Sequence, residues 1–117
     1  MKEHPDTAKI EAMIRALGYD ADNHWIKVTH FTKGRIDFFF IKEVKTKIHL
    51  IFQPDNFGRV LRAEPECAEL RISKHADTVY PKFTAKGAPR TSCGVGVVFD
   101  NEQVIEMGNF LRNLETA

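Results

Sequence analysis

Along residues 25–53, aromatic and cationic side chains stand at alternate positions, with apolar residues between them. Side chains at every second position of a β-strand lie on the same face, so this spacing would gather rings and cations on one surface. Such a surface suits single-stranded nucleic acid, because cations contact phosphates and rings stack on unpaired bases at about 1–3 kcal/mol per base. The predicted ligand-binding residues on this face are Trp25, Lys27, Phe31, Arg35, Phe39, Lys45, Lys47 and His49.

The charge distribution agrees with this prediction. Residues 25–53 contain six basic and two acidic side chains, a net charge of +4, whereas the whole chain carries only +1. The small total charge excludes a strongly basic architectural protein and an acidic mimic of nucleic acid. The apolar positions between the predicted ligand residues are expected to face the helices. They are Ile26, Val28, Ile36, Phe38, Phe40, Ile48, Leu50 and Phe52.

Two other interpretations of the same residues stay open. In one, Lys and Arg only solvate the open face of a sheet, while the rings lie under the loops of residues 54–92. In the other, this face or an edge strand docks a protein partner, as in inhibitor, immunity or chaperone-like proteins. Trp25, Phe31 and Phe39 would then be the anchors, since interface energy concentrates in aromatic and Arg side chains.

A nuclease is a third alternative. Asp37 followed by Glu43-Val44-Lys45 resembles the Asp and Glu-x-Lys elements of PD-(D/E)xK nucleases, which implies two carboxylates that hold a divalent metal and a lysine that positions the nucleophile. That chemistry needs the two acids on adjacent strands. Residues 38–41 contain no turn signal, so the sequence favours coincidence.

Metal and cofactor motifs give no further candidate. The five histidines show no i, i+4 pair, and Cys67 and Cys93 are far apart without C-x-x-C spacing. Gly94-x-Gly96 lacks the third glycine of a dinucleotide-binding fingerprint. We therefore predict no catalytic residue, no metal ligand and no cofactor.

The hydrophobic pattern predicts an α+β fold, with an N-terminal helix, an antiparallel β-meander of about five strands and a C-terminal amphipathic helix on one sheet face. A helix is expected over residues 7–17, where Ile10, Met13, Ile14 and Leu17 recur at helical spacing, with Asp6 as N-cap and Gly18 as the C′ stop. Residues 19–24 are expected to form a polar loop. Strands are expected over residues 25–31, 35–42, 45–53 and 95–99.

The segment from 54 to 92 is less defined. Residues 60–62 and 68–74 are compatible with strands, and residues 65–70 with one helical turn. Val79, Tyr80 and Phe83 indicate a short strand, and residues 85–91 a loop. The closing helix is expected to start at Asp100 as N-cap, with Gln103 completing a capping box, and to present Val104, Ile105, Met107, Phe110, Leu111 and Leu114 to the sheet.

Gly94-Val95-Gly96-Val97-Val98-Phe99-Asp100-Asn101-Glu102-Gln103, followed by an amphipathic helix, resembles the strand-to-helix end of transcriptional-coactivator-type single-stranded-DNA-binding proteins. The likeness covers residues 91–114. It implies a curved antiparallel sheet with a helix, single-stranded DNA as the ligand and pairing into a homodimer.

The 117 residues are expected to form a single domain. No run of about 18 apolar residues occurs, so no membrane span is predicted. The first six residues lack the apolar core of a secretory signal, and we expect a cytoplasmic location. The predicted partner is single-stranded nucleic acid or a protein.

Overall fold

The computed structural model describes residues 4–24, 28–42, 44–71, 79–83 and 89–117. Within these ranges no helix has the length and apolar character needed to cross a membrane. The elements, in chain order, are α1 (Thr7–Ala16), β1 (Asp20–His24), β2 (Val28–Lys33), β3 (Ile36–Ile41), β4 (Lys47–Phe52), the 3-10 helix η1 (Pro54–Asn56), α2 (Phe57–Arg62), β5 (Glu69–Arg71), β6 (Val79–Phe83), β7 (Pro89–Cys93), β8 (Val95–Asp100) and α3 (Val104–Leu114).

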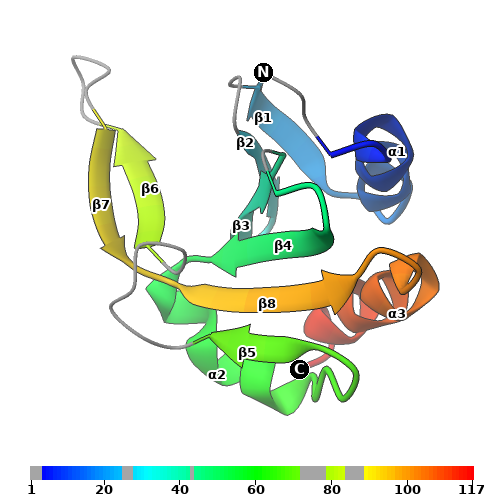
Figure 1. The fold of residues 1–117 in the computed structure, drawn as a ribbon. Coiled ribbons are helices and arrows are strands. Elements are labelled where there is room, and N and C mark those ends of the chain that lie inside the picture. Colours follow the sequence, from blue (N-terminus) through cyan, green and yellow to red (C-terminus); the bar gives the residue numbers. More distant parts are fainter. Residues whose placement is uncertain (1–3, 25–27, 43, 72–78, 84–88) are drawn as a thin grey trace.

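The predicted α+β architecture is confirmed. Six antiparallel strands form one sheet in the order β1-β2-β3-β4-β8-β5, one more strand than expected, and β6 and β7 form a separate hairpin. Figure 1 shows α1 and α3 on one side of the sheet and the β6–β7 hairpin on the other. The last strand, β8, lies between β4 and β5, so it connects the meander to the short edge strand.

The two longer helices bury the expected apolar faces. In α1 the buried residues are Thr7, Ile10, Glu11 and Ile14, which follow the i, i+3, i+4, i+7 spacing. In α3 the buried stripe includes Val104, Met107, Phe110, Leu111 and Leu114. Ile105 was predicted in this stripe but is 71% exposed, because its position falls beside the buried face of α3. The helices therefore meet the sheet through contiguous apolar surfaces.

Phe38 lies at the centre of the core that the helices cover. Its ring centroid is 4.8 Å from Phe52, 5.4 Å from Tyr19 and 5.6 Å from Phe31. All four rings are buried. Full burial of one such side chain contributes about 1.5–3 kcal/mol, so this aromatic cluster is a major source of stability.

The ends of the two helices differ in how closely they match the sequence prediction. Gly18 adopts a φ of +94° directly after α1, as expected of a C′ glycine, and Lys33 Nζ donates a hydrogen bond of 2.7 Å to the carbonyl of Leu17. The helix α3 begins at Val104 with Gln103 as N-cap, three residues later than predicted. Gln103 still accepts a bond of 2.8 Å from Asp100 N–H, whereas the Asp100 carboxylate binds Lys47 instead of the helix.

The expected loops at residues 20–24 and 89–91 were wrong, and residues 60–62, whose element type was open, are helical. Residues 20–24, expected in a loop, form the edge strand β1, where a polar sequence is tolerated because pairing with β2 supplies the backbone hydrogen bonds. Residues 60–62 belong to α2, and residues 89–93 pair with β6. The short strand predicted around residues 79–83 is confirmed.

Tyr19 connects the sheet side of the core to α3. Its hydroxyl donates a hydrogen bond of 2.9 Å to the carbonyl of Leu111. Burial raises the pKa of this phenol well above its ordinary value of 10.0, and the nearby Glu115 carboxylate raises the pKa further. The protonated phenol is therefore favoured in the folded state.

The Tyr19→Phe variant is expected to lose about 1–2 kcal/mol of unfolding free energy near neutral pH, because a buried carbonyl loses its donor. The folded-state pKa lies above the unfolded one, so the contribution of Tyr19 is fully present below about pH 10 and declines as pH rises beyond it. Urea unfolding at about pH 8 and about pH 10.5 should show the difference between variant and wild type shrinking at the higher pH. An unchanged difference would contradict this account.

Candidate functional site

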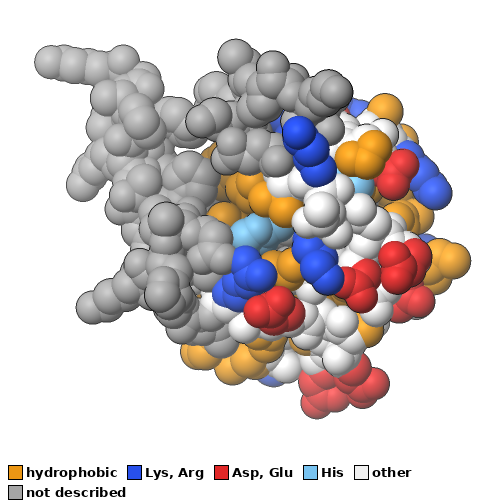
Figure 2. Space-filling model, in the orientation of Figure 1, with side chains coloured by type: hydrophobic (Ala, Val, Ile, Leu, Met, Phe, Trp, Pro, Cys, Tyr) orange, Lys and Arg blue, Asp and Glu red, His pale blue; other side chains and the backbone are white. Residues whose placement is uncertain are grey.

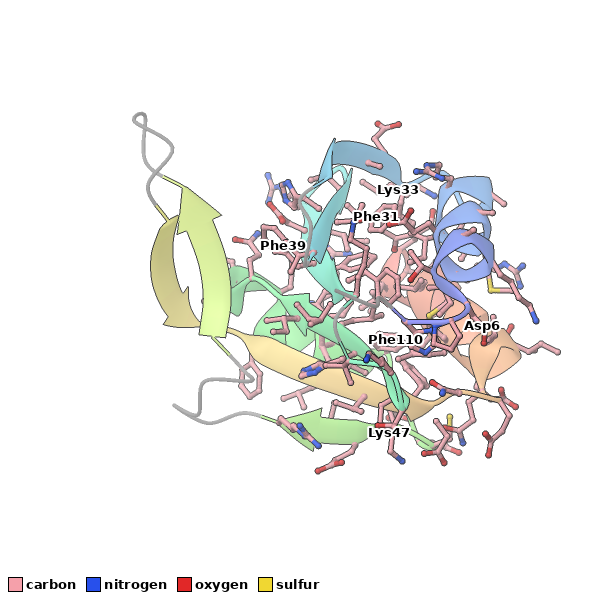
Figure 3. All side chains as sticks on the ribbon, turned by 45° about the horizontal axis from the view of Figure 1, so that its top comes forward. Asp6, Phe31, Lys33, Phe39, Lys47 and Phe110 are labelled. Carbon is pink, nitrogen blue, oxygen red and sulfur yellow. The ribbon has the colours of Figure 1, made fainter. Side chains whose placement is uncertain are left out.

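The two described rings predicted to stack on bases lie on opposite faces of the sheet. Phe31 is fully buried in the core under the helices, whereas Phe39 packs with Ile41 and Ile51 on the other face and is only 2% exposed. Figure 3 shows Phe31 and Phe39 on opposite sides of the β2–β3 ribbon, with Lys47 far from both. The predicted face is therefore wrong for Phe31, whereas Phe39 lies on the predicted face but is buried there instead of exposed.

The error for Phe31 lies in the phase of β2, that is, in which alternate residues of the strand face the helices. Thr29 and Phe31 face the helices and are fully buried, while Val28 packs in the Phe39 cluster on the other face. The Thr29 hydroxyl donates a hydrogen bond to the buried carboxylate of Glu11 in α1, which satisfies both polar groups in the core. A shift of one residue moves every side chain of a strand to the opposite face.

The strands β3 and β4 have the predicted phase. Their inward side chains all belong to the core under the helices, namely Ile36, Phe38, Phe40, Ile48, Leu50 and Phe52. Trp25, Lys27 and Ile26 lie outside the described residues.

The other predicted ligand residues have different surroundings. His49 is buried, with 3% exposure, and Lys45 is exposed. Lys47 is exposed and donates a hydrogen bond to the Asp100 carboxylate, which raises the pKa of its ammonium. On the face seen in Figure 2, hydrophobic and histidine side chains lie beside the grey residues, with basic and acidic side chains around them.

Arg35 is exposed and lines a polar pocket of about 500 Å³ beside the β2–β3 turn. An adjoining hollow of about 250 Å³ shares Gly34, Arg35 and Arg59 with it. The lining residues of the larger pocket come from the turn, from η1 and from α2. They are Gly34, Arg35, Asp37, Gln53, Asp55, Asn56, Gly58, Arg59 and Arg62. Three arginines and two aspartates therefore line one space, and their formal charges sum to +1.

Asn56 fixes the turn that carries Arg35. Its side chain is 3% exposed, donates a bond of 3.0 Å to the carbonyl of Arg35 and accepts one of 3.0 Å from Asp37 N–H. Gly34 has a φ of +60°, a conformation that suits glycine at a tight turn. Gln53 N–H also donates 3.0 Å to the carbonyl of Asp37. These bonds hold η1 against the start of β3 and so position one wall of the pocket.

The other two arginines come from α2. Arg59 Nη1 donates hydrogen bonds of 2.8 Å to the carbonyl of Leu114 and 3.3 Å to that of Ala117, which ties α2 to the end of α3. Arg62 is exposed, and its Nη1 would lie 3.1 Å from a Cβ placed at Gly58. The guanidinium of Arg62 thus lies along α2 on the side that faces the pocket.

One of the two carboxylates has a partner that does not line the pocket. His30 Nε2 lies 2.5 Å from Asp37 Oδ1, and the His30 ring stacks on Phe39 at a centroid distance of 4.7 Å. One carboxylate oxygen of Asp37 therefore contacts His30 of β2, a residue outside the pocket lining. Asp55 is exposed, so solvent screens its charge.

Arg59 and Arg62 were missed from the sequence, although a signal was present. Both fall in the segment whose element type stayed open, and a strand over residues 60–62 would have placed them on different elements. Once residues 57–62 are helical, the spacing i, i+3 puts both guanidinium groups on one side of α2.

The described residues do not show the arrangement that the nuclease motif requires, with two carboxylates on adjacent strands. The strand β3 runs without a turn from Ile36 to Ile41, so no second strand begins in the described residues directly after Asp37. Glu43 itself is outside the described residues. Among the described residues, no group of three His, Cys, Asp or Glu side chains is arranged to hold a metal ion.

A second pocket, of about 400 Å³, lies between the segment after α2 and the helix α3. Its lining includes Glu64, Glu66 and Glu106. An acidic hollow of this kind repels an anionic ligand, so it does not extend the arginine-lined pocket.

Comparison with protein-family models, with curated proteins and with solved structures finds no match to this chain. The resemblance of residues 91–114 to single-stranded-DNA-binding proteins, and the homodimer that it implies, stay predictions. The functional interpretation therefore depends on the geometry of the pocket.

Proposed function

We propose that this chain is a non-enzymatic binding module that holds an oxyanion of its ligand, a phosphoryl or carboxylate group, in the pocket lined by Arg35, Arg59 and Arg62. The observation that supports the proposal is that three arginines from two separate segments line one open polar pocket. The planar donor fork of Arg matches the oxygens of carboxylates and phosphates and forms charge-assisted hydrogen bonds with them.

The walls of the pocket are held in place before a ligand arrives. Asn56 fixes the backbone on both sides of Ile36, and the carbonyl of Leu114 holds Arg59. A binding site that is already ordered loses less conformational entropy when the ligand binds. This support favours a specific site over general attraction to a charged surface.

The sequence favours single-stranded nucleic acid as the ligand. With the rings of Phe31 and Phe39 buried, such a ligand would bind mainly through phosphate contacts. Arg35 keeps that role, but Phe31 and Phe39 are buried. Lys47 lies at the start of β4 and the pocket at its end, a separation of about 20 Å along an extended strand of six residues. A compact oxyanion site explains the arrangement better than a track along a nucleic-acid strand.

The proposal predicts that inorganic phosphate binds saturably, with a dissociation constant in about the millimolar range. In NMR titrations of the full chain, the side-chain N–H signals of Arg35, Arg59 and Arg62 should shift. The Arg62→Gln variant should bind phosphate at least about tenfold more weakly, because it loses a charged donor.

The Lys45→Gln variant is the matched control, since it removes an exposed cation outside the pocket and should leave phosphate binding unchanged. Chloride at equal ionic strength controls for screening. Equal shifts with chloride and phosphate, or equal affinity in Arg62→Gln and wild type, would refute the oxyanion site.

A further inference from the structure

The helix α2 exposes two large apolar side chains next to the arginine-lined pocket. Phe57 is 39% exposed and Leu61 is 43% exposed, and they lie one helical turn apart. At 100° per residue, the pair occupies one side of α2, and Gly58, Arg59 and Arg62 occupy the adjacent side that lines the pocket. Apolar surface and cations therefore lie side by side on one short helix.

The third side of α2 attaches it to the protein. Val60 is completely buried and Ala63 nearly so, both in the core that the helices share with the sheet. Packing of Val60 and Ala63 on this neighbouring side thus fixes how α2 presents Phe57 and Leu61. Among the described residues, only Ile105 is another large hydrophobic side chain with comparable exposure.

We propose that α2 and the pocket together dock an acidic segment of a protein partner. An Asp or Glu carboxylate of the partner enters the pocket, and an apolar side chain close to it in sequence packs on Phe57 and Leu61. This inference depends on the proposed oxyanion site and names the source of the oxyanion. Aromatic and Arg side chains are the residues in which interface energy concentrates.

The charges and the apolar pair favour a protein over nucleic acid. Asp37 and Asp55 line the same pocket, so a continuous phosphate backbone would pass two carboxylates, whereas a single carboxylate group needs to contact only the arginines. Leu61 has no ring on which a base could stack, but it complements an aliphatic side chain. The surface thus fits an acidic residue beside an apolar one.

A photo-cross-linking residue placed at Phe57 in the full chain, expressed in cells that naturally encode it, tests this inference. We expect a covalent adduct with a protein that resists nuclease treatment and decreases at least about tenfold when Arg62→Glu is added. Peptide mapping should place the cross-link within about three residues of an Asp or Glu in the partner, the reach set by strand spacing.

The same cross-linker at Ile105 is the matched control, since this residue is also exposed but lies on α3 away from the pocket lining. Absence of an adduct at position 57, an adduct with nucleic acid, equal yield at position 105 or insensitivity to Arg62→Glu would each overturn the inference. If phosphate binds as proposed but no protein adduct forms, only the partner assignment fails. If phosphate does not bind, the oxyanion site itself fails.

Discussion

The Phe38→Ala variant is expected to lose about 3–5 kcal/mol of unfolding free energy. Phe38 is completely buried, and its ring contacts those of Tyr19, Phe31 and Phe52. Removing it leaves a cavity between β3 and the helices that this rigid aromatic cluster cannot fill. Urea unfolding followed by circular dichroism measures the loss as a lower midpoint at unchanged slope.

The Ile105→Ala variant is the control for this prediction, because it truncates a large apolar side chain that is 71% exposed. Its effect should stay within about 0.5 kcal/mol. A Phe38→Ala protein that unfolds within about 1 kcal/mol of wild type would show that Phe38 does not occupy the centre of the core.

The Asn56→Ala variant is expected to lose about 2–3 kcal/mol of unfolding free energy and to weaken phosphate binding as well. The substitution removes the bonds to the carbonyl of Arg35 and to Asp37 N–H, and unpaired buried polar groups cost about 1–3 kcal/mol each. The turn that carries Arg35 loses its anchor, so the guanidinium is less ordered in the pocket. Chemical denaturation and the phosphate titration measure the two effects on the same protein.

The Gln53→Ala variant provides the comparison, because the Gln53 side chain makes only a bond of 3.5 Å to the same carbonyl in an exposed position. It should change stability by less than about 0.5 kcal/mol, and Lys45→Gln, outside the pocket, remains the control for phosphate affinity. An Asn56→Ala protein with wild-type phosphate affinity would show that the turn does not position the pocket.

Much of the fold could be predicted because local patterns determine it. The i, i+4 spacing of Ile10 and Ile14 in α1, and the stripe of α3, reflect packing on a single apolar surface. The alternation of Ile48, Leu50 and Phe52 set the phase of β4 correctly. In these elements the residues that decide the structure lie within a few positions of one another.

Local alternation did not predict which residues of β2 face the helices. Its buried polar residue, Thr29, is satisfied by Glu11, which lies 18 positions earlier in α1. The alternating pattern of β2 predicts Thr29 to be exposed, because the sequence near Thr29 does not reveal its partner Glu11. The burial of Phe39 in β3 could not be predicted either, since a strand buried on both faces shows no alternation.

The candidate site depended on the same long-range information. Arg35 was selected correctly as an exposed cation, but its companions Arg59 and Arg62 are more than twenty positions away and belong to a helix that the sequence left undefined. The amide of Asn56 joins the two segments. A charge count over residues 25–53 could not reveal a pocket that two separate segments build.

Crystals of the protein soaked in selenate, with selenium located by anomalous scattering, give the most direct measurement of whether the arginines act together on one anion. We expect selenate between the guanidinium groups of Arg35 and Arg62, with N···O distances of about 2.7–2.9 Å. A solvent-accessible pocket without selenium, in crystals where selenate occupies other surface sites such as those near Lys45, would contradict the account.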